Sequence, residues 1–450
     1  MTRLATLLAA AVLLAACSNS QSAEPPTSLV QVPVAAAWSM FRGDLFRDGH
    51  PAGATLSAAT AARLTLAWQT DLGSPIESSP VVAGGLIVVG TAGGSLAALT
   101  PLRGEKLWVV TGLGPLRGQP LIAEGKVFVG SDDGHLYAVE LLTGNRIWDW
   151  RAPGLKPAIL GGPVLFKGLL LVGIGTQPGA PLEAGRLAAL DPASGDRLWA
   201  TCLRPGCEAG GGVASSIAID SAGIGYVEAG SQLDALVAFD VGIGKVLWTH
   251  PLATSPEPGS GLIATPLLFL SQGSEWVAAA GPEGRLTVVA AATGSEGWSR
   301  VLFKAGPADS ISGSPGSDGQ RLFIPSAGTP IGLQAVGRDD GHKIWSYQSQ
   351  QPVFSSPAVG KDVVVFGEGA PGGAPGGALL AVSALDGHEV WRFSAGVGVM
   401  ASPAIVGDSV FGADLRGRLL AFRPTDSGSQ PQASSVDATA VQNSLPATMA

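Results

Sequence analysis

Few side chains in this sequence have the types and spacing that a chemical site requires. The five histidines, at positions 50, 135, 250, 342 and 388, are too far apart in the sequence to be the paired ligands of a zinc site. No serine, cysteine or paired-carboxylate arrangement has the pattern of a catalytic centre. We therefore expect no catalytic, cofactor-binding or metal-binding residues.

Two short motifs invite a chemical interpretation but are better explained as loops. Asp132-Asp133-Gly134 resembles part of a calcium-binding loop, yet the later acidic ligand of such a loop is missing. The glycine-rich run APGGAPGGA at 370–378 lacks the strand and helix that flank a phosphate-binding loop. We interpret the first as a turn and the second as a hairpin tip.

The cysteines have two different expected roles. Cys202 and Cys207, in CLRPGC, are separated by four residues, whereas a redox pair has two intervening residues. In an oxidising compartment a small disulfide loop is favoured over a thiol or a metal site. Cys17 follows a basic residue and an apolar run from Leu4 to Leu14, which is too short to cross a bilayer and is typical of an export signal.

The residues around Cys17 favour lipidation. Leu14-Ala15-Ala16-Cys17 matches the bacterial lipobox, so residues 1–16 are expected to be removed and Cys17 to carry the lipid. The alternative is an ordinary signal peptide with a free cysteine. The small, polar, proline-containing residues that follow predict a tether, so the segment 17–37 is expected to hold the lipidated cysteine and this tether. The expected location is the cell envelope, at the outer membrane facing the periplasm or, alternatively, at the cell surface.

The overall charge excludes one class of partner. The formal net charge is −8, only 14% of residues are charged, and no basic stripe occurs. Nucleic-acid binding is therefore not expected. The segment 424–450 is rich in serine, alanine and glutamine and is expected to be disordered.

The elements that would position a site are indicated by a tryptophan repeat. Gaps of 40 to 51 residues separate eight tryptophans, which are Trp68, Trp108, Trp148, Trp199, Trp248, Trp298, Trp345 and Trp391. Only Trp38, Trp150 and Trp276 fall outside this series. Self-similarity at such a period indicates a repeat architecture.

Each repeat has the composition of four short strands. The unit 78–108 holds three runs rich in branched and aromatic residues and a fourth run that ends in tryptophan, and the unit 118–148 repeats this order. A glycine lies three or four residues before each tryptophan after the first, as a tight hairpin requires. Four antiparallel strands in this length are typical of one propeller blade. The tryptophans are expected to lie between neighbouring blades, with their N–H groups bonded.

The first and last units complement each other. The last unit, 401–422, supplies three strands and no tryptophan strand, whereas Trp68 lies in a strand with no preceding three. We predict an all-β fold, a single eight-bladed propeller of four-stranded antiparallel blades over 65–423, closed by the Trp68 strand and preceded by a lead-in at 38–64. Closure removes exposed sheet edges.

Strand direction predicts which face carries the long loops. If the four strands A to D alternate in direction, B–C turns and D–A connections share one face, and nearly all insertions fall in these two classes. In repeat proteins such asymmetry often marks the binding face. The alternative is that its polar residues are solvated loop positions. The candidate residues on this face are Trp150, Arg151, Lys156, Arg204, Glu208, His250, Glu257 and Asp309.

Three units end in a shared pattern, at 138–148, 189–199 and 238–248. They resemble the quinoprotein, or PQQ-like, propeller repeat, which ends in Ala-x-Asp-x-x-(Thr/Ser)-Gly-x-x-x-Trp. The resemblance covers roughly 65–423, and WSMFRGDLFRDG at 38–49 is similar to the lead-in of many such bacterial proteins. It implies a propeller fold.

Two functions share this repeat. Quinoprotein dehydrogenases hold pyrroloquinoline quinone (PQQ) and calcium in the ring, and alcohol enzymes often add a vicinal cysteine pair, which is absent here. The BamB family of envelope lipoproteins is non-catalytic and supports assembly of outer-membrane β-barrels. We expect a monomeric, lipid-anchored ring without a cofactor that presents its looped face to an envelope protein such as a β-barrel assembly complex. The alternatives are a PQQ-dependent dehydrogenase with calcium and a propeller that binds glycans or other small ligands.

Overall fold

The computed structural model describes residues 37–425, except for 52, 231, 254–263 and 305–312. The chain divides into a unit Met1–Gln31, which is wholly outside the described residues, and a unit Val32–Ala450. The expectations for residues 1–36 and 426–450, and those for Glu257 and Asp309, therefore lie outside the described residues. No helix in the described part is long and apolar enough to cross a membrane.

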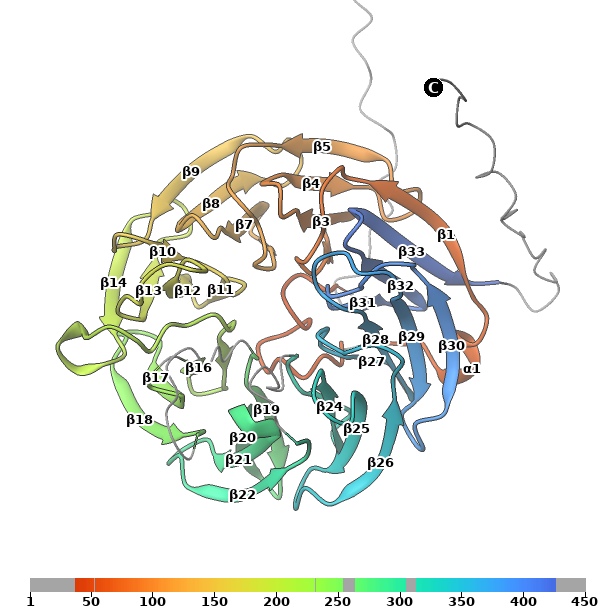
Figure 1. The fold of residues 1–450 in the computed structure, drawn as a ribbon. Coiled ribbons are helices and arrows are strands. Elements are labelled where there is room, and N and C mark those ends of the chain that lie inside the picture. The colour runs from red at the N-terminus through yellow and green to blue at the C-terminus, as the bar shows by residue number, and fades with distance from the viewer. Residues whose placement is uncertain (1–36, 52, 231, 254–263, 305–312, 426–450) are drawn as a thin grey trace, which may run out of the picture. The chain divides into compact units, whose positions relative to one another are not determined.

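Eight antiparallel sheets form the blades of one ring, numbered here in chain order from the first complete sheet (Figure 1). Blade 1 is β2 (Val81–Ala83), β3 (Leu86–Gly90), β4 (Leu96–Leu99) and β5 (Lys106–Val110). Blade 2 is β6 (Leu121–Ala123), β7 (Lys126–Gly130), β8 (His135–Glu140) and β9 (Arg146–Arg151). Blade 3 is β10 (Pro157–Ala158), β11 (Val164–Phe166), β12 (Leu169–Thr176), β13 (Arg186–Leu190) and β14 (Arg197–Cys202). Its innermost strand is split, because β10 and β11 both pair with β12.

The next three blades follow the same order from the inside outwards. Blade 4 is β15 (Ala218–Ile219), β16 (Ile224–Ala229), β17 (Ala235–Asp240) and β18 (Val246–Pro251). Blade 5 is β19 (Leu267–Ser271), β20 (Ser274–Ala280), β21 (Arg285–Ala290) and β22 (Glu296–Val301). Blade 6 is β23 (Gly316–Ser317), β24 (Arg321–Ser326), β25 (Gly332–Gly337) and β26 (Lys343–Gln348).

The last two blades close the ring. Blade 7 is β27 (Ala358–Val359), β28 (Val363–Glu368), β29 (Ala378–Ser383) and β30 (Glu389–Ser394). Blade 8 is β31 (Ala404–Val406), β32 (Ser409–Ala413), β33 (Arg418–Pro424) and β1 (Leu64–Asp71). The outer strand β1 pairs antiparallel with β33 from Leu64↔Pro424 to Asp71↔Arg418. The prediction of an all-β, eight-bladed propeller closed by the Trp68 strand is therefore confirmed.

The burial of the strands explains their composition. The inner strand β3 is buried at all five positions, because neighbouring blades cover both faces of each sheet. A strand covered on both faces reads as a continuous apolar run. The outer strand β18 instead alternates between half-buried and exposed residues, so only one side of it meets a neighbour. Among the described residues, the short helices α1 (Ala58–Ala61), η2 (Pro205–Cys207) and η3 (Pro282–Gly284) lie outside the strands, in the segments that connect or precede them.

The repeated tryptophans join each blade to the next one. Seven indole N–H groups donate to backbone carbonyls of the following blade over 2.8 to 3.3 Å. The bond from Trp391 ends on Leu64 O at the start of β1, so it reaches the closing strand. Trp199 differs from the others, because its buried indole nitrogen has no hydrogen-bond partner among the described residues.

The hairpin glycines are required by these indoles as well as by the turn. At Gly387 φ is +76°, and a β-carbon there would lie 2.5 Å from Cε3 of Trp345 in the preceding blade. The same approach, 2.3 to 2.8 Å, recurs at the six equivalent glycines Gly104, Gly144, Gly195, Gly244, Gly294 and Gly341. Sequence reasoning identified the turn requirement, and the structure adds the steric one.

The lead-in segment 38–49 runs through the middle of the ring, where it is drawn in red (Figure 1). Its carbonyls accept hydrogen bonds of 2.7 to 2.9 Å from the N–H groups of equivalent inner-strand residues in six blades. These donors are Val82, Ile122, Ile219, Leu268, Ser317 and Val359. The innermost strand of a blade has one edge without a strand partner, and the lead-in satisfies that edge.

Two buried arginines hold the lead-in in place. Arg42 is 2% exposed and donates to Arg47 O at 2.7 Å, Asp48 O at 2.9 Å and Pro357 O at 3.1 Å. Arg47 is fully buried and donates to Ile217 O at 2.9 Å in blade 4. Burial lowers the pKa of each guanidinium to about 10, so both stay charged at neutral pH.

A buried carboxyl group lies between blades 4 and 5. Glu228 is 0% exposed, and its Oε1 accepts a 2.8 Å bond from the N–H of Ala280. Its Oε2 has no hydrogen-bond partner in the described part of the chain. Burial raises the pKa of this carboxyl well above its usual value, so the neutral acid is favoured in the folded protein.

The contact between tryptophan and glycine can be separated from backbone strain by two substitutions. Gly387→Ala and Gly125→Ala both place a side chain at a φ of +70° to +76°, but the space around Gly125 is empty. The shared strain should cost about 1–2 kcal/mol, and the clash with Trp345 should add about 1–3 kcal/mol at Gly387. Urea unfolding of both variants measures the difference. Equal losses would show that the indole contributes nothing at this turn.

The role of Arg42 is tested by its removal. Arg42→Ala leaves three buried carbonyls without their donor and should lower the free energy of unfolding by about 3 kcal/mol or more. The control is Arg416→Ala, because Arg416 is exposed and should change stability by less than about 0.5 kcal/mol. Thermal unfolding compares the two. Similar melting temperatures would contradict the role of the lead-in.

The raised pKa of the Glu228 carboxyl predicts that the free energy of unfolding depends on pH. Because its pKa is raised in the folded state, its favourable contribution is complete below the unfolded-state pKa and is lost as pH rises toward the folded-state pKa. Glu228→Gln should therefore become progressively more stable than wild type between about pH 4 and pH 8. Denaturant unfolding at several pH values measures this. Parallel pH profiles for the two proteins would refute the prediction.

Candidate functional site

The long loops of blade 3 and its neighbours pack together on the face where B–C turns and D–A connections emerge, called here the loop face. Three segments take part, which are 151–157, 177–185 and 202–213. The first connects blades 2 and 3, the second joins β12 to β13, and the third connects blades 3 and 4. We call these three segments the blade-3 loop cluster.

Glu183 connects the three segments. Its carboxylate accepts hydrogen bonds from the backbone N–H groups of Leu155 at 3.1 Å and Lys156 at 2.5 Å. Its backbone carbonyl accepts a 2.9 Å bond from the N–H of Gly210 in the third segment. Because one residue contacts both neighbouring loops, the cluster forms a defined surface.

The third segment is also held covalently and by charge. Cys202 and Cys207 form a disulfide that closes a short loop. Arg204 lies within this loop and pairs with Glu208 at 2.8 Å. It also donates to Oε1 of Gln232 at 3.0 Å, which lies between β16 and β17 of blade 4. The cluster therefore extends toward blade 4.

The structure brings together some of the predicted face residues. Arg151, Lys156, Arg204 and Glu208 all lie in the blade-3 loop cluster. Trp150 lies beside it near the end of β9, where it is half-buried against the core of blades 2 and 3.

His250 lies apart from the cluster. It is half-buried at the outer seam between blades 4 and 5, with Nδ1 at 3.0 Å from Gly294 O and Nε2 at 3.7 Å from Glu296. His250 follows Trp248 by two residues on β18, so the alternation of the strand turns it toward the neighbouring blade.

Sequence reasoning missed two apolar residues of the cluster. Leu155 has 86% of its surface exposed, and Leu182 has 37% exposed. The available signal was a leucine between Gly154 and Lys156, in a loop that has no strand pattern. An exposed leucine in a fixed loop can serve as an anchor for a partner.

A second feature of the loop face is the mouth of the central channel. A cavity of about 250 Å³ lies there, with Phe41 of the lead-in in its lining. Hydroxyl groups at the starts of the inner strands surround it, and each accepts a 2.8 to 3.0 Å bond from a backbone N–H of the preceding blade. These hydroxyls belong to Ser79, Ser216, Thr265, Ser314, Ser356 and Ser402.

The described lining of this mouth does not fit a quinone with calcium. Calcium takes about six to eight oxygen ligands, usually with several carboxylates. Glu77 is the only carboxylate in the described lining, and it pairs with Arg117 at 3.1 Å. Arg117 also pairs with Asp132, so it is not free to bind a carboxylate of the quinone. The hydroxyls already take part in bonds between blades.

The family model described as outer membrane protein assembly factor BamB matches residues 52–280 and 282–445. No curated protein matches the chain. The solved structures of similar fold include both enzymes and BamB.

Three solved structures illustrate this range. The quinohemoprotein alcohol dehydrogenase from Comamonas testosteroni gives a TM-score of 0.73 at 18% identity, over 88% of this chain and 82% of that chain. A europium-containing methanol dehydrogenase gives 0.69 at 16% identity, over 86% and 98%. BamB from Moraxella catarrhalis gives 0.63 at 14% identity, over 80% and 99%.

At these identities the solved structures show the fold alone, and they do not separate enzyme from non-enzyme. The family model, in contrast, matches most of the chain and the ring that it forms. The chain therefore belongs to the PQQ-like propeller family whose model is described as outer membrane protein assembly factor BamB.

Proposed function

We propose that this chain is a non-catalytic, lipid-anchored propeller that binds a protein partner in the cell envelope through the blade-3 loop cluster. The partner that we propose is a β-barrel assembly complex of the outer membrane. The membership in the BamB-described family and the lipobox at Cys17 support this role.

The observation that carries the proposal is the occupation of the channel by the chain itself. Residues 38–49 bond to the inner strands of six blades, and Arg42 and Arg47 are buried among them. A ring cofactor would have to share this space with Phe41 and would meet a single carboxylate that is already paired. The outer surfaces of the ring are therefore the available places for recognition.

The blade-3 loop cluster has properties that suit protein binding. Leu155 offers an exposed apolar side chain, and Arg151, Lys156 and Glu208 add charges of both signs to the cluster. The bonds of Glu183 and the disulfide fix the loops before binding, which reduces the entropy lost on association. An apolar anchor within a polar rim is the usual anatomy of a protein interface.

The proposal is tested by recovery of the partner with matched variants. The full chain, tagged and expressed in its own bacterium, is purified from membranes as wild type, Leu155→Asp and Leu385→Asp. Leu385 is the control, because it is 63% exposed and lies in a turn on the opposite face. We expect wild type and Leu385→Asp to recover the assembly complex and Leu155→Asp to lose about tenfold or more. Equal recovery by all three proteins, or none with wild type, would contradict the proposal.

The dehydrogenase alternative is tested on the purified chain. PQQ and calcium are added, and the quinone absorbance and the oxidation of alcohols are followed. We expect neither stoichiometric quinone binding nor turnover. Stoichiometric quinone binding or alcohol oxidation would contradict the scaffold proposal and indicate a dehydrogenase.

A further inference from the structure

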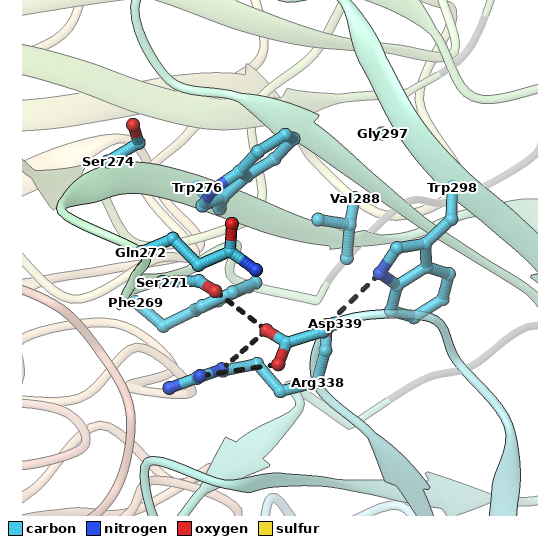
Figure 2. A pocket seen from close by; sticks show the side chains of 10 residues that line it. All are labelled: Phe269, Ser271, Gln272, Ser274, Trp276, Val288, Gly297, Trp298, Arg338 and Asp339. Carbon is cyan, nitrogen blue, oxygen red and sulfur yellow. Dashed lines mark hydrogen bonds and ion pairs between the residues drawn. The ribbon is translucent and has the colours of Figure 1, made fainter.

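Figure 2 shows a second cavity, of about 240 Å³, between blades 5 and 6. It lies beside an A–B turn and a C–D turn, and these turns emerge on the face opposite the loop face. The hairpin turn of β19 and β20 and the turn between β25 and β26 border it. Trp276 and Trp298 form two of its walls, and Arg338 and Asp339 lie beside Phe269 at another side. The cavity shares no residue with the blade-3 loop cluster.

The cavity arises where blade 5 departs from the repeat. On the third strand, the residue that pairs with the repeated tryptophan is alanine in seven blades. In blade 5 this residue is Val288. On the second strand, the residue that pairs with this third-strand position is Ala278 in blade 5. In the other seven blades the residue at this second-strand position is larger than alanine. The seven larger residues are Val88, Phe128, Leu171, Tyr226, Phe323, Val365 and Phe411.

Two further departures shape the same cavity. Four other blades have an aromatic residue at the position of Ala278, whereas blade 5 has one two residues earlier on β20, at Trp276, which lines the cavity. Gly297 precedes the repeated tryptophan where other blades have a side chain, and a β-carbon there would lie 2.5 Å from Cζ3 of Trp276. Four positions around this one cavity therefore depart from the repeat.

The charged groups of the cavity neutralise each other. Asp339 accepts bonds from Nε of Arg338 at 3.0 Å and from Oγ of Ser271 at 2.7 Å. The guanidinium of Arg338 also donates to Leu270 O at 3.0 Å and lies 5.8 Å from the centre of the Phe269 ring. A free ion of either sign would therefore find no uncompensated charge here.

Neutral hydrogen-bonding groups remain available at the opening. The side chains of Gln272 and Ser274 are exposed, and in the described part of the chain neither has a hydrogen-bond partner. The same holds for the half-buried indole N–H of Trp276. Together these groups supply donors and acceptors around an aromatic surface.

We propose that this cavity binds one neutral sugar ring. A pyranose presents an apolar face of C–H groups that packs on an indole, and its hydroxyls both donate and accept hydrogen bonds. Trp276 supplies the aromatic surface, and Gln272, Ser274 and Asp339 supply the partners for the hydroxyls. The volume lies below the ~300–1,000 Å³ that is typical of sites for drug-sized ligands, so a single ring suits the cavity better than a chain.

The proposal is tested by titrating the full chain with the methyl glycosides of glucose, galactose, mannose and N-acetylglucosamine, followed by saturation-transfer NMR and calorimetry. We expect at least one glycoside to bind saturably. Trp276→Ala should weaken that binding about tenfold or more, and Gln272→Ala should weaken it severalfold. Gln320→Ala is the matched control, because Gln320 is exposed on a neighbouring turn outside the cavity and should bind as wild type does.

The melting temperature of each variant shows whether it is folded. Should Trp276→Ala unfold, the exposed Gln272→Ala still decides the question, since its side chain supports no packing. Saturable binding by none of the four glycosides, or binding that Gln272→Ala and Trp276→Ala leave unchanged, would overturn the proposal. The recovery of a protein partner through Leu155 is measured separately, so the failure of one proposal leaves the other intact.

Discussion

The structure depends on one repeated contact, in which an indole of one blade packs against the next blade. Seven of the eight indoles lie on a glycine turn there, and seven, all but Trp199, donate their N–H to a carbonyl there. Each blade has two apolar faces, and only its two neighbours can cover them. A row of such sheets would leave apolar faces at both ends, so the contact must continue around a closed circle. The bond from Trp391 to Leu64 is where the circle meets the N-terminal strand. The ring is thus a consequence of the packing of one kind of blade.

Closing the ring creates a channel, and the chain fills much of it with its own lead-in. The inner edges of the blades need hydrogen-bond partners, and a short irregular segment with two buried arginines supplies them. Beside the lead-in, a cavity lined by hydroxyls lies at the mouth of the channel. In the proposed function, recognition takes place on the faces of the ring, where loops can vary without disturbing the contacts between blades. The proposed partner surface and the proposed sugar site lie on opposite faces of the ring.

Much of this fold could be predicted from the sequence, because tryptophan spacing reports directly on a contact that repeats in every blade. The incomplete first and last units likewise predicted closure. The path of residues 38–49 could not be predicted, since no periodic pattern shows which carbonyl meets which inner strand. His250 was assigned to the loop face because it follows Trp248 in a predicted D–A connection, but it lies on β18, where strand alternation turns it into a seam. Trp276 was recognised as outside the series, yet its cavity follows from the pairing register of β20, β21 and β22, which only the structure provides.

The claim that the first strand completes the last blade is the basis for the rest, and amide hydrogen exchange measures it directly. If β1 is an integral part of blade 8, its amides that bond to β33 should open only with the whole ring, as slowly as those of the buried strand β17 in blade 4. Protection of β1 at the level of β17 is the predicted result. Exchange of β1 at rates typical of a frayed terminus, with β33 protected, would contradict a ring sealed by the N-terminal strand.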